Sequence, residues 1–309
     1  MDIRIDQLTK RFGPQTAVDA ITFTVRTGEV LGFLGPNGAG KSTTMKMICG
    51  LLAPDRGTIE VGGRSVLDDP GSVRRHIGYL PENNPLYEDM PVLDFLRFTA
   101  KVQGVDRGRT DERIREMVDV CGLDPEKHKR IGELSKGYRQ RVGLAQAMVH
   151  DPEVLILDEP TSGLDPNQIV EIRELIKEVG RAKTVIFSTH ILPEVEATCD
   201  RILIINKGRI VADGSPEQLR QQAQGKALLR VRIEDGASDA VQKALGVLPG
   251  VTLADVVVGA QDRFDLQCEA PDGVAREVFR LCVDRGWTLT ELRSMGSSLE
   301  DVFRDLTLN

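Results

Sequence analysis

The stretch GPNGAGKS, Gly35–Ser42, has the composition of a loop that binds a triphosphate. It follows the apolar run Val30–Leu34 and precedes a helical pattern. In a strand, glycine-rich turn and helix of this order, backbone N–H groups wrap the phosphates and the helix dipole adds to their attraction. Lys41 is expected to reach the β and γ phosphates, and Ser42 to ligate Mg²⁺. The alternative, a glycine-rich surface turn, leaves the match at all eight positions unexplained.

A second anion site is indicated at LSKGYRQR, Leu134–Arg141, where Ser and Gly lead into a helical pattern. Unpaired N–H groups and the positive end of the helix dipole point outward together at such a start. Gly35–Ser42 already supplies a phosphate loop. The same chain therefore carries two separate segments, each of which could form one half of a phosphate-binding site.

Two acids end the apolar run of VLILDEPTSGLD, Val154–Asp165. At the carboxyl edge of a parallel sheet, Asp158 could hold Mg²⁺ through water and Glu159 could polarise the attacking water. The alternative is a helix start capped by acids. His190 follows the next apolar run, TVIFSTH, and is expected at the same edge near a γ-phosphate; its alternative is a structural histidine.

The elements that must position these residues are predicted as an α/β fold. The continuous apolar runs Val30–Leu34, Val154–Leu157, Thr184–Ser188 and Ile202–Ile205 indicate parallel strands buried on both faces. Strands with polar alternation are expected at Ile3–Ile5, Ile21–Val25 and Thr58–Val61, which predicts an antiparallel subdomain.

A helical insertion is expected at about residues 85–140. One apolar stripe there comprises Val92, Leu93, Phe95, Leu96 and Val102, and another Ile114, Met117, Val118 and Cys121.

The chain is predicted to divide into residues 1–220 and a C-terminal accessory domain, residues 225–309. The segment Ala227–Thr307 reads strand, helix, strand, strand, helix, strand, helix. The βαββαβ order predicts an α+β ferredoxin-like module closed by a last helix around Ser298–Leu306. It offers no catalytic constellation, so a regulatory or dimer-supporting role is expected.

Composition restricts the partners and the compartment. The net charge of −7 and pI of about 5.3 argue against broad attachment to nucleic acid or anionic lipid. The five cysteines are scattered without metal-ligand spacing, which favours a reducing cytoplasm. No apolar run approaches the roughly 18 residues of a membrane span, and the first residues lack the pattern of a signal peptide.

The phosphate loop, LSKGY, LDEP, SGLD and STH together resemble the ATP-binding subunit of an ABC transporter over residues 1–220. The resemblance implies an ATPase of the P-loop NTPase fold, in which two copies pair head to tail around two ATP molecules and Mg²⁺. Ser135 and Gly137 would contact the partner's γ-phosphate, and the loop of Asp165 would cross the interface. Phe12 would stack on adenine; its alternative is a core aromatic. The implied contacts of ATP in the phosphate loop are Gly35, Asn37, Gly38, Ala39, Gly40, Lys41, Ser42 and Thr43.

Two departures from the family pattern stand out. The usual LSGGQ reads LSKGY, with Lys136 and Tyr138, while the Ser and Gly that contact phosphate are retained. In GYLPENNP, Glu82 stands where the family has Gln. A carboxylate only accepts hydrogen bonds and adds negative charge beside Mg²⁺ and triphosphate, so Glu82 is expected to serve the metal and water network; the alternative is a turn cap. PNGAGKSTTMKMICGLL, LSKGYRQRVGLAQA and SLEDVF most resemble exporter ATPases of the ABC-2 type, in particular the branch associated with gliding motility.

The expected function is the motor of a separate membrane permease, with the chain bound peripherally at the cytoplasmic face of the inner membrane. In this family the region of NPLYEDMPVLDFLRF receives a permease helix, so Leu86 and Tyr87 are contact candidates; their alternative is ordinary local core. The competing function is a soluble ABC ATPase acting on ribosomes or DNA. The single phosphate loop, and the spacing of only 94 positions from Lys41 to Ser135, disfavour it.

Overall fold

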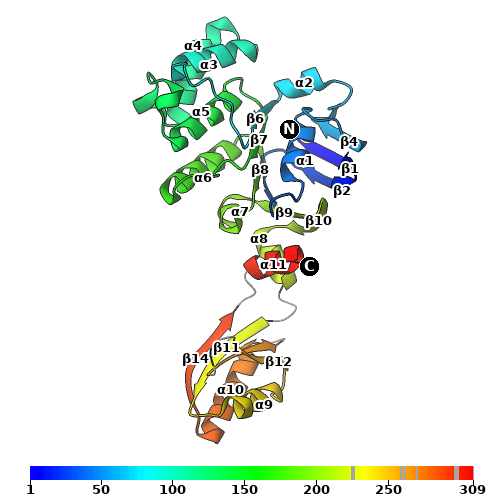
Figure 1. The fold of residues 1–309 in the computed structure, drawn as a ribbon, viewed down its shortest axis with the longest axis vertical. Helices are drawn as coiled ribbons and strands as arrows, with labels where there is room; N and C mark the ends of the chain where they lie inside the picture. Colours follow the sequence, from blue (N-terminus) through cyan, green and yellow to red (C-terminus); the bar gives the residue numbers. More distant parts are fainter. Residues whose placement is uncertain (224–226, 258–259, 261, 269–270, 296–298, 309) are drawn as a thin grey trace. The chain divides into compact units, whose positions relative to one another are not determined.

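The computed structural model describes residues 1–223, 227–257, 260, 262–268, 271–295 and 299–308. The chain forms two compact units, Met1–Pro216 and Glu217–Asn309 (Figure 1). Each unit has its own hydrophobic core. Among the described residues, every helix is too short or too polar to cross a lipid bilayer.

A six-stranded sheet forms the centre of the first unit. Its order is β10-β9-β3-β8-β7-β6, in which only the β10–β9 pair is antiparallel. All residues of β3, β7 and β8 are buried, so this part of the sheet is covered on both faces as its apolar sequence predicts. The strands are β3 (Val30–Leu34), β6 (Ile77–Leu80), β7 (Val154–Asp158), β8 (Thr184–Thr189), β9 (Arg201–Asn206) and β10 (Arg209–Gly214).

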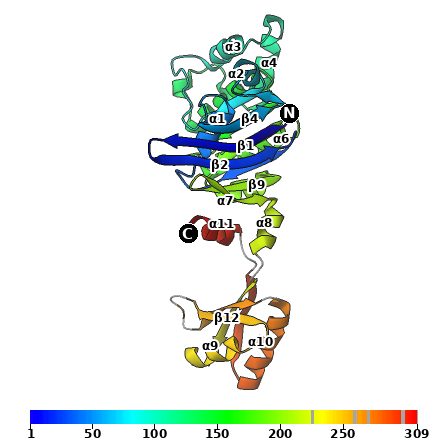
Figure 2. The ribbon, with the colours of Figure 1, turned by 90° about the vertical axis from the view of Figure 1, so that its right-hand side faces the viewer.

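The predicted antiparallel subdomain is a second sheet of order β2-β1-β4-β5. Its strands are β1 (Ile3–Phe12), β2 (Gln15–Val25), β4 (Arg56–Val61) and β5 (Arg64–Ser65). Figure 2 shows β1 and β2 side by side as the longest pair. Both are longer than predicted because the polar residues after Ile5 continue the pairing through register shifts, which carries Phe12 to the end of β1. Helix α1 (Lys41–Ile48) and residues of both sheets share one core.

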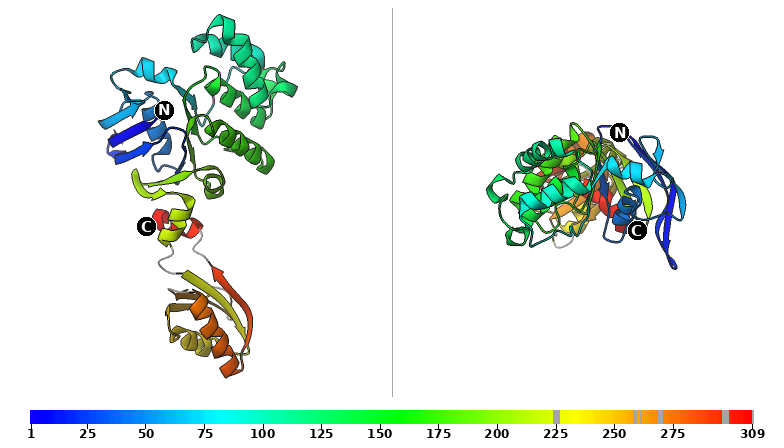
Figure 3. Two further views of the ribbon diagram at one scale, coloured as in Figure 1. Left: turned by 180° about the vertical axis from the view of Figure 1, so that it is seen from behind. Right: turned by 90° about the horizontal axis from the view of Figure 1, so that it is seen from above.

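The predicted helical insertion comprises α3 (Val92–Val102), α4 (Arg107–Val120) and α5 (Lys136–Met148), with 3₁₀ turns at Asp124–Glu126 and Ile131–Glu133. Figure 3 shows these helices, cyan to green, on the opposite side of the first unit from the blue strands. Both predicted stripes are largely buried, but the placing of Val102 on the first was wrong. It is the last residue of α3 and is 67% exposed. The remaining helices of this unit are α2 (Pro70–Arg75), α6 (Pro166–Gly180) and α7 (Leu192–Thr198); α8 (Pro216–Ala223) begins where the units divide.

The second unit has the predicted ferredoxin-like arrangement. Its antiparallel sheet has the order β12-β13-β11-β14, and residues of α9 and α10 share its core. The elements are β11 (Ala227–Glu234), α9 (Ser238–Gly246), β12 (Val251–Val256), β13 (Arg263–Cys268), α10 (Pro271–Arg285), β14 (Thr288–Met295) and α11 (Leu299–Leu308). Ser298, the expected start of the last helix, lies outside the described residues.

A buried arginine fastens α4 to the end of α5. Arg113 is 5% exposed, and its guanidinium donates to the carbonyl oxygens of Val149 at 3.1 Å and Met148 at 2.9 Å. Its third partner is Glu116, one turn along α4. Because the last carbonyls of a helix have no partner within it, these bonds satisfy the end of α5 as well as the arginine.

Arg113→Met should loosen this junction, since methionine fills much of the space but donates no hydrogen bond. Charged hydrogen bonds of this kind contribute about 1.5–3 kcal/mol each, so the opening free energy of α4 and α5 should fall by about 2 kcal/mol or more. Amide hydrogen exchange of the two helices measures this directly. Arg115, two residues after Arg113, lies on the exposed face of α4. Arg115→Met is therefore the control and should leave hydrogen exchange unchanged. Equal exchange in the two variants would contradict the junction.

Candidate active site

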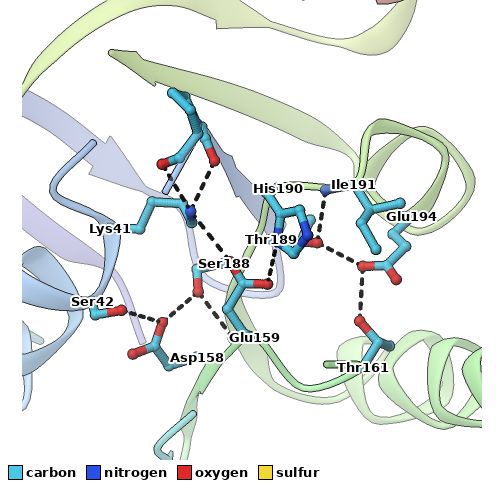
Figure 4. Close-up of polar contacts among 12 residues, drawn as sticks. Lys41, Ser42, Asp158, Glu159, Thr161, Ser188, Thr189, His190, Ile191 and Glu194 are labelled. Atoms are coloured by element: carbon cyan, nitrogen blue, oxygen red, sulfur yellow. Dashed lines mark hydrogen bonds and ion pairs between the residues drawn. The ribbon is translucent and has the colours of Figure 1, made fainter. Parts of the chain in front are cut away.

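The phosphate loop lies at the carboxyl end of β3, beside the ends of β7 and β8 (Figure 4). Gly35 N donates to Thr189 O at 3.3 Å, which ties the loop to β8. Gly38 and Gly40 have φ of +80° and +107°, a region that favours glycine. A Cβ on Gly40 would lie 2.4 Å from Ala17 O, whereas one on Gly38 would meet nothing within 4 Å. Backbone conformation and close packing together therefore require glycine at position 40.

Lys41 is buried among acceptors at the start of α1. It is 5% exposed, and its Nζ donates to Gly35 O at 2.8 Å and Pro36 O at 3.3 Å. The Nζ also pairs with Glu159 Oε1 at 3.2 Å. The lysine thus folds back on its own loop, and its charge is balanced by the second acid of β7's end.

Ser42 and Asp158 form a pair of hard oxygen donors. Ser42 Oγ donates to Asp158 Oδ1 at 3.0 Å, and Ser188 Oγ donates to the same oxygen at 2.6 Å. Asp158 is 1% exposed. A hydroxyl beside a carboxylate suits Mg²⁺, which is usually held by one or two protein oxygens together with phosphates and water. The described residues contain no group of three or more side chains that would hold a metal ion alone, and this ion does not need one.

Glu159 is held in a strained conformation between two basic groups. Its φ is +50°, where non-glycine residues are uncommon, and it is 6% exposed. Its N–H points to Ser188, with O at 3.2 Å and Oγ at 3.1 Å. Its Oε2 lies 2.9 Å from His190 Nδ1, so the carboxylate bridges Lys41 and the partly exposed histidine.

The negative charge of Asp158 extends its influence beneath the site. Burial first, and then the charges of Asp158 and Glu82, raise the pKa of the Tyr79 phenol on β6. Burial and Asp158 also raise the pKa of the Cys49 thiol at the end of α1. Both groups therefore stay neutral to a higher pH than an exposed tyrosine or cysteine would.

A cavity of about 440 Å³ opens over the phosphate loop. Phe12 lines it from the end of β1 and is 50% exposed, so the alternative of a core aromatic is wrong. Glu82 reaches it from the segment after β6. The lining residues are Phe12, Gln15, Ala17, Asn37, Gly38, Gly40, Lys41, Ser42, Thr43, Glu82 and Glu159. Gly35 and the buried Ala39 support the loop from behind.

Ser135, Gly137 and Asp165 do not line this cavity. Ser135 caps α5 by accepting from Tyr138 N at 3.3 Å, and Asp165 caps α6 by accepting from Asn167 N and Gln168 N at 3.0 Å. Gly137 packs against Gln168, where a Cβ would lie 2.6 Å from the side chain. The start of α5 is thus fitted to the start of α6 within one chain.

A second cavity, of about 490 Å³, lies where the start of α5 meets the Glu82 segment. Lys136 and Arg139 line it from α5, and Glu82 and Glu159 line both cavities. Lys136 also lies over Gly163 of the SGLD loop, where a Cβ would be 2.0 Å from its Nζ. The two acids therefore line both the cavity at the phosphate loop and the cavity at the start of α5.

Sequence reasoning missed four polar residues behind the site. Ser188 supports Asp158 and Glu159, while Glu194 accepts hydrogen bonds from Thr161 and Thr189. All are buried. The available signal was the polar end of TVIFST, because polar residues inside a fully buried strand need partners.

Residues 18–162 match the family model described as ABC transporter, and residues 130–195 match a model described as AAA domain, putative AbiEii toxin, Type IV TA system. The uncharacterized ABC transporter ATP-binding protein YxlF of Bacillus subtilis is 37% identical over 302 residues, 97% of this chain and 98% of its own. The bacitracin transport ATP-binding protein BcrA of Bacillus licheniformis is 37% identical, covering 71% of this chain and 72% of its own.

Solved structures give the same fold for the first unit. The structure of an ATP-binding subunit of an ABC transporter superposes with a TM-score of 0.66 at 33% identity, over 72% of this chain and 93% of that one. The dimeric bacterial ABC transporter cassette MJ0796 has a TM-score of 0.64 at 23% identity, over 69% of this chain and 98% of that one.

Gly40→Ala should destabilise the ligand-free protein more than Gly38→Ala. Both substitutions strain a backbone of positive φ, at about 1 kcal/mol, but only the first drives a Cβ into a carbonyl oxygen. Thermal unfolding of the first unit, followed by circular dichroism, should show the larger loss for Gly40→Ala. Equal losses would mean that the contact with Ala17 does not constrain the loop.

Proposed function

The chain belongs to the ABC transporter family as an ATP-binding subunit, and we propose that it drives the permease of an ABC exporter as a head-to-tail homodimer. It binds and hydrolyses ATP with Mg²⁺ as the usual ion of this family. The observation that best supports the roles proposed below is the placement of Glu159 between Lys41 and His190, next to the Ser42–Asp158 pair.

In the proposed cycle, Lys41 exchanges partners. It leaves the loop carbonyls and Glu159 to bind the β and γ phosphate oxygens. Such an exchange keeps a buried cation paired throughout, which matters because an unpaired buried charge is costly. Phe12 stacks on the adenine, and the amides of the loop bind the phosphates.

Glu159 then serves as the general base. Once released by Lys41, its carboxylate orients the attacking water and accepts its proton, while His190 contacts the γ-phosphate. Ser42 and Asp158 would hold Mg²⁺, which when bound would supply positive charge to the phosphates. Glu82, which also lines the cavity, would contribute through the metal and water network.

The homodimer is proposed because Ser135 and Gly137 of one chain do not line the cavity at its own phosphate loop. Ser135 and Gly137, at the start of α5, would complete the partner's site, and the loop of Asp165 would cross between the sites. The cassette MJ0796, whose structure is dimeric, has the same fold as the first unit, and this supports a dimer of the present chain.

A partly apolar hollow on the helical insertion is the proposed permease contact. Leu86, Tyr87, Glu88, Asp89, Met90 and Phe98 line a cavity of about 460 Å³. Tyr87 is 57% exposed and packs edge-on against Phe98 with ring centroids 5.7 Å apart, so the alternative of buried local core is wrong for Tyr87. The apolar residues of this hollow, together with the neighbouring Glu88 and Asp89, suit an amphipathic helix with basic residues.

Export is the proposed direction, with the chain held by its permease at the cytoplasmic face of the cell membrane. The names of relatives concerned with bacitracin transport and linearmycin resistance support this. An ABC-2 permease, or a complex associated with gliding motility, rests on the sequence resemblance alone and stays a prediction. The soluble role on ribosomes or DNA is not favoured, because these relatives are named for transport and resistance.

Glu159→Gln should lower ATP turnover by about a hundredfold or more, because the amide keeps the shape and loses the base. ATP binding should hold or strengthen, since Lys41 loses a competing carboxylate. ATP-dependent dimers should accumulate in size-exclusion runs. Glu174→Gln, on the exposed side of α6, is the control. Wild-type turnover in the Glu159 variant would refute the assignment.

The double variant Ser135→Arg with Glu159→Gln tests the role of Ser135 in the dimer separately from the role of Glu159 as the base. The arginine would block the partner's phosphate position, so the ATP-dependent dimer should be lost while each chain still binds ATP. Dimers that persist unchanged would show that Ser135 does not act across the interface.

Tyr87→Ser should reduce capture of the permease while leaving basal ATP hydrolysis unchanged. The measurement is mass spectrometry of integral membrane proteins that copurify with the tagged chain from detergent-solubilised membranes. Val102→Ser, at an exposed apolar position on α3 outside the hollow, is the matched control and should retain capture. Undiminished capture by the Tyr87 variant would exclude the hollow as the contact.

A further inference from the structure

A buried carboxyl group joins two loops that flank the candidate active site. Glu194, on α7, is 2% exposed. Its Oε2 accepts from Thr161 Oγ1 at 2.9 Å and from Thr189 Oγ1 at 2.7 Å (Figure 4). Thr161 lies two residues after Glu159, on the way to Asp165, and Thr189 immediately precedes His190.

We propose that Glu194 is a positioning residue, which fixes His190 and the Thr161–Asp165 loop relative to each other so that they move as one. The proposal rests on the proposed function of Glu159, His190 and Asp165. It adds a device that would transmit displacement at the dimer-facing loop to the histidine beside the γ-phosphate.

The contacts form a closed ring. Glu159 Oε2 meets His190 Nδ1 at 2.9 Å, the backbone leads from His190 to Thr189, and Glu194 joins Thr189 to Thr161. The backbone then returns to Glu159 through a turn in which Ser162 N donates to Glu159 O at 3.1 Å. Since every link is a hydrogen bond or a short piece of chain, neither loop can shift without stretching the ring.

The ring also holds the histidine's backbone. Thr189 Oγ1 accepts from Ile191 N at 3.0 Å, which fixes the turn that presents His190. Gly35 N donates to Thr189 O, so the same residue supports the phosphate loop. Thr189 therefore links Glu194 to both phosphate-facing parts of the site.

Packing alone gives no reason for a carboxyl group here. Within the described residues no Lys, Arg or His pairs with Glu194, and its Oε1 is buried without a hydrogen-bond partner among protein atoms. Burying such a group is unfavourable, and an apolar side chain would fill the space without that cost. What the acid provides is one oxygen that accepts from two loops at once.

The test compares Glu194→Met, which removes the acceptor, with Glu194→Gln, which keeps one acceptor oxygen. Thr161→Val removes one donor with little change of shape. Glu194→Met and Thr161→Val should each lower kcat for ATP by about tenfold, with KM within about twofold, and Glu194→Gln should recover most of kcat. Thr198→Val is the matched control, since Thr198 is a buried threonine on α7 whose hydroxyl has no partner among protein atoms.

A second readout is independent of turnover and dimerisation. The imidazole NMR signals of His190 in the nucleotide-free chain should shift and broaden in Glu194→Met and Thr161→Val, and stay at their wild-type positions in Thr198→Val. These signals test the ring even if the Glu159 variant forms no ATP-dependent dimer. Wild-type signals together with wild-type kcat in both variants would overturn the proposal, as would equal effects in the Thr198 control.

Discussion

The buried pair of Lys41 and Glu159 is the interaction on which the rest of the site depends. Lys41 lies at the start of α1, which follows β3, and Glu159 lies at the end of β7. In the sheet, β8 separates β3 from β7, and buried apolar side chains set this strand order. Both are under a tenth exposed, so removing either partner would leave an uncompensated buried charge. Lys41 and Glu159 must therefore lie within ion-pair distance of each other at the carboxyl edge of the sheet. The close packing of Gly35 and Gly40 allows the loop to approach this closely.

This pair also explains how a folded site can remain ready for a triphosphate. A cation held by the carbonyls of its own loop and by one carboxylate could pass to phosphate oxygens, in the proposed cycle, without losing a partner. The strained backbone of Glu159 fits the same interpretation, because strain of this kind persists only where surrounding contacts fix it. Here the two contacts from Ser188 and the bridge to His190 do so.

Much of this could be predicted from the sequence because strand ends and glycine patterns are local signals. Continuous apolar runs placed β3, β7 and β8 in one sheet, and with them the loop, the acid pair and His190 at one edge. The alternation of strands and helices likewise predicted the ferredoxin-like unit. Glu194 could not be found this way, since its partners lie 33 and 5 residues away and meet only after α7 packs. Phe12 and Val102 depended on where β1 and α3 end, which periodicity does not determine.

Glu82 and Glu159 line both the cavity at the phosphate loop and the cavity at the start of α5. In the proposed dimer, these two acids would therefore connect nucleotide binding to hydrolysis. Lys136 and Arg139 at the start of α5 line the second cavity together with these two acids. Attraction toward the basic residues of α5 would draw Glu159 away from Lys41. Binding of a triphosphate to Lys41 would also weaken the Lys41–Glu159 pair. The departure from LSGGQ to LSKGY adds a positive charge to the lining of this cavity, and Glu82 in place of Gln adds a negative charge to the same lining. The two departures from the family pattern therefore place opposite charges on the lining of one cavity, where each changes the electrostatic surroundings of Glu159.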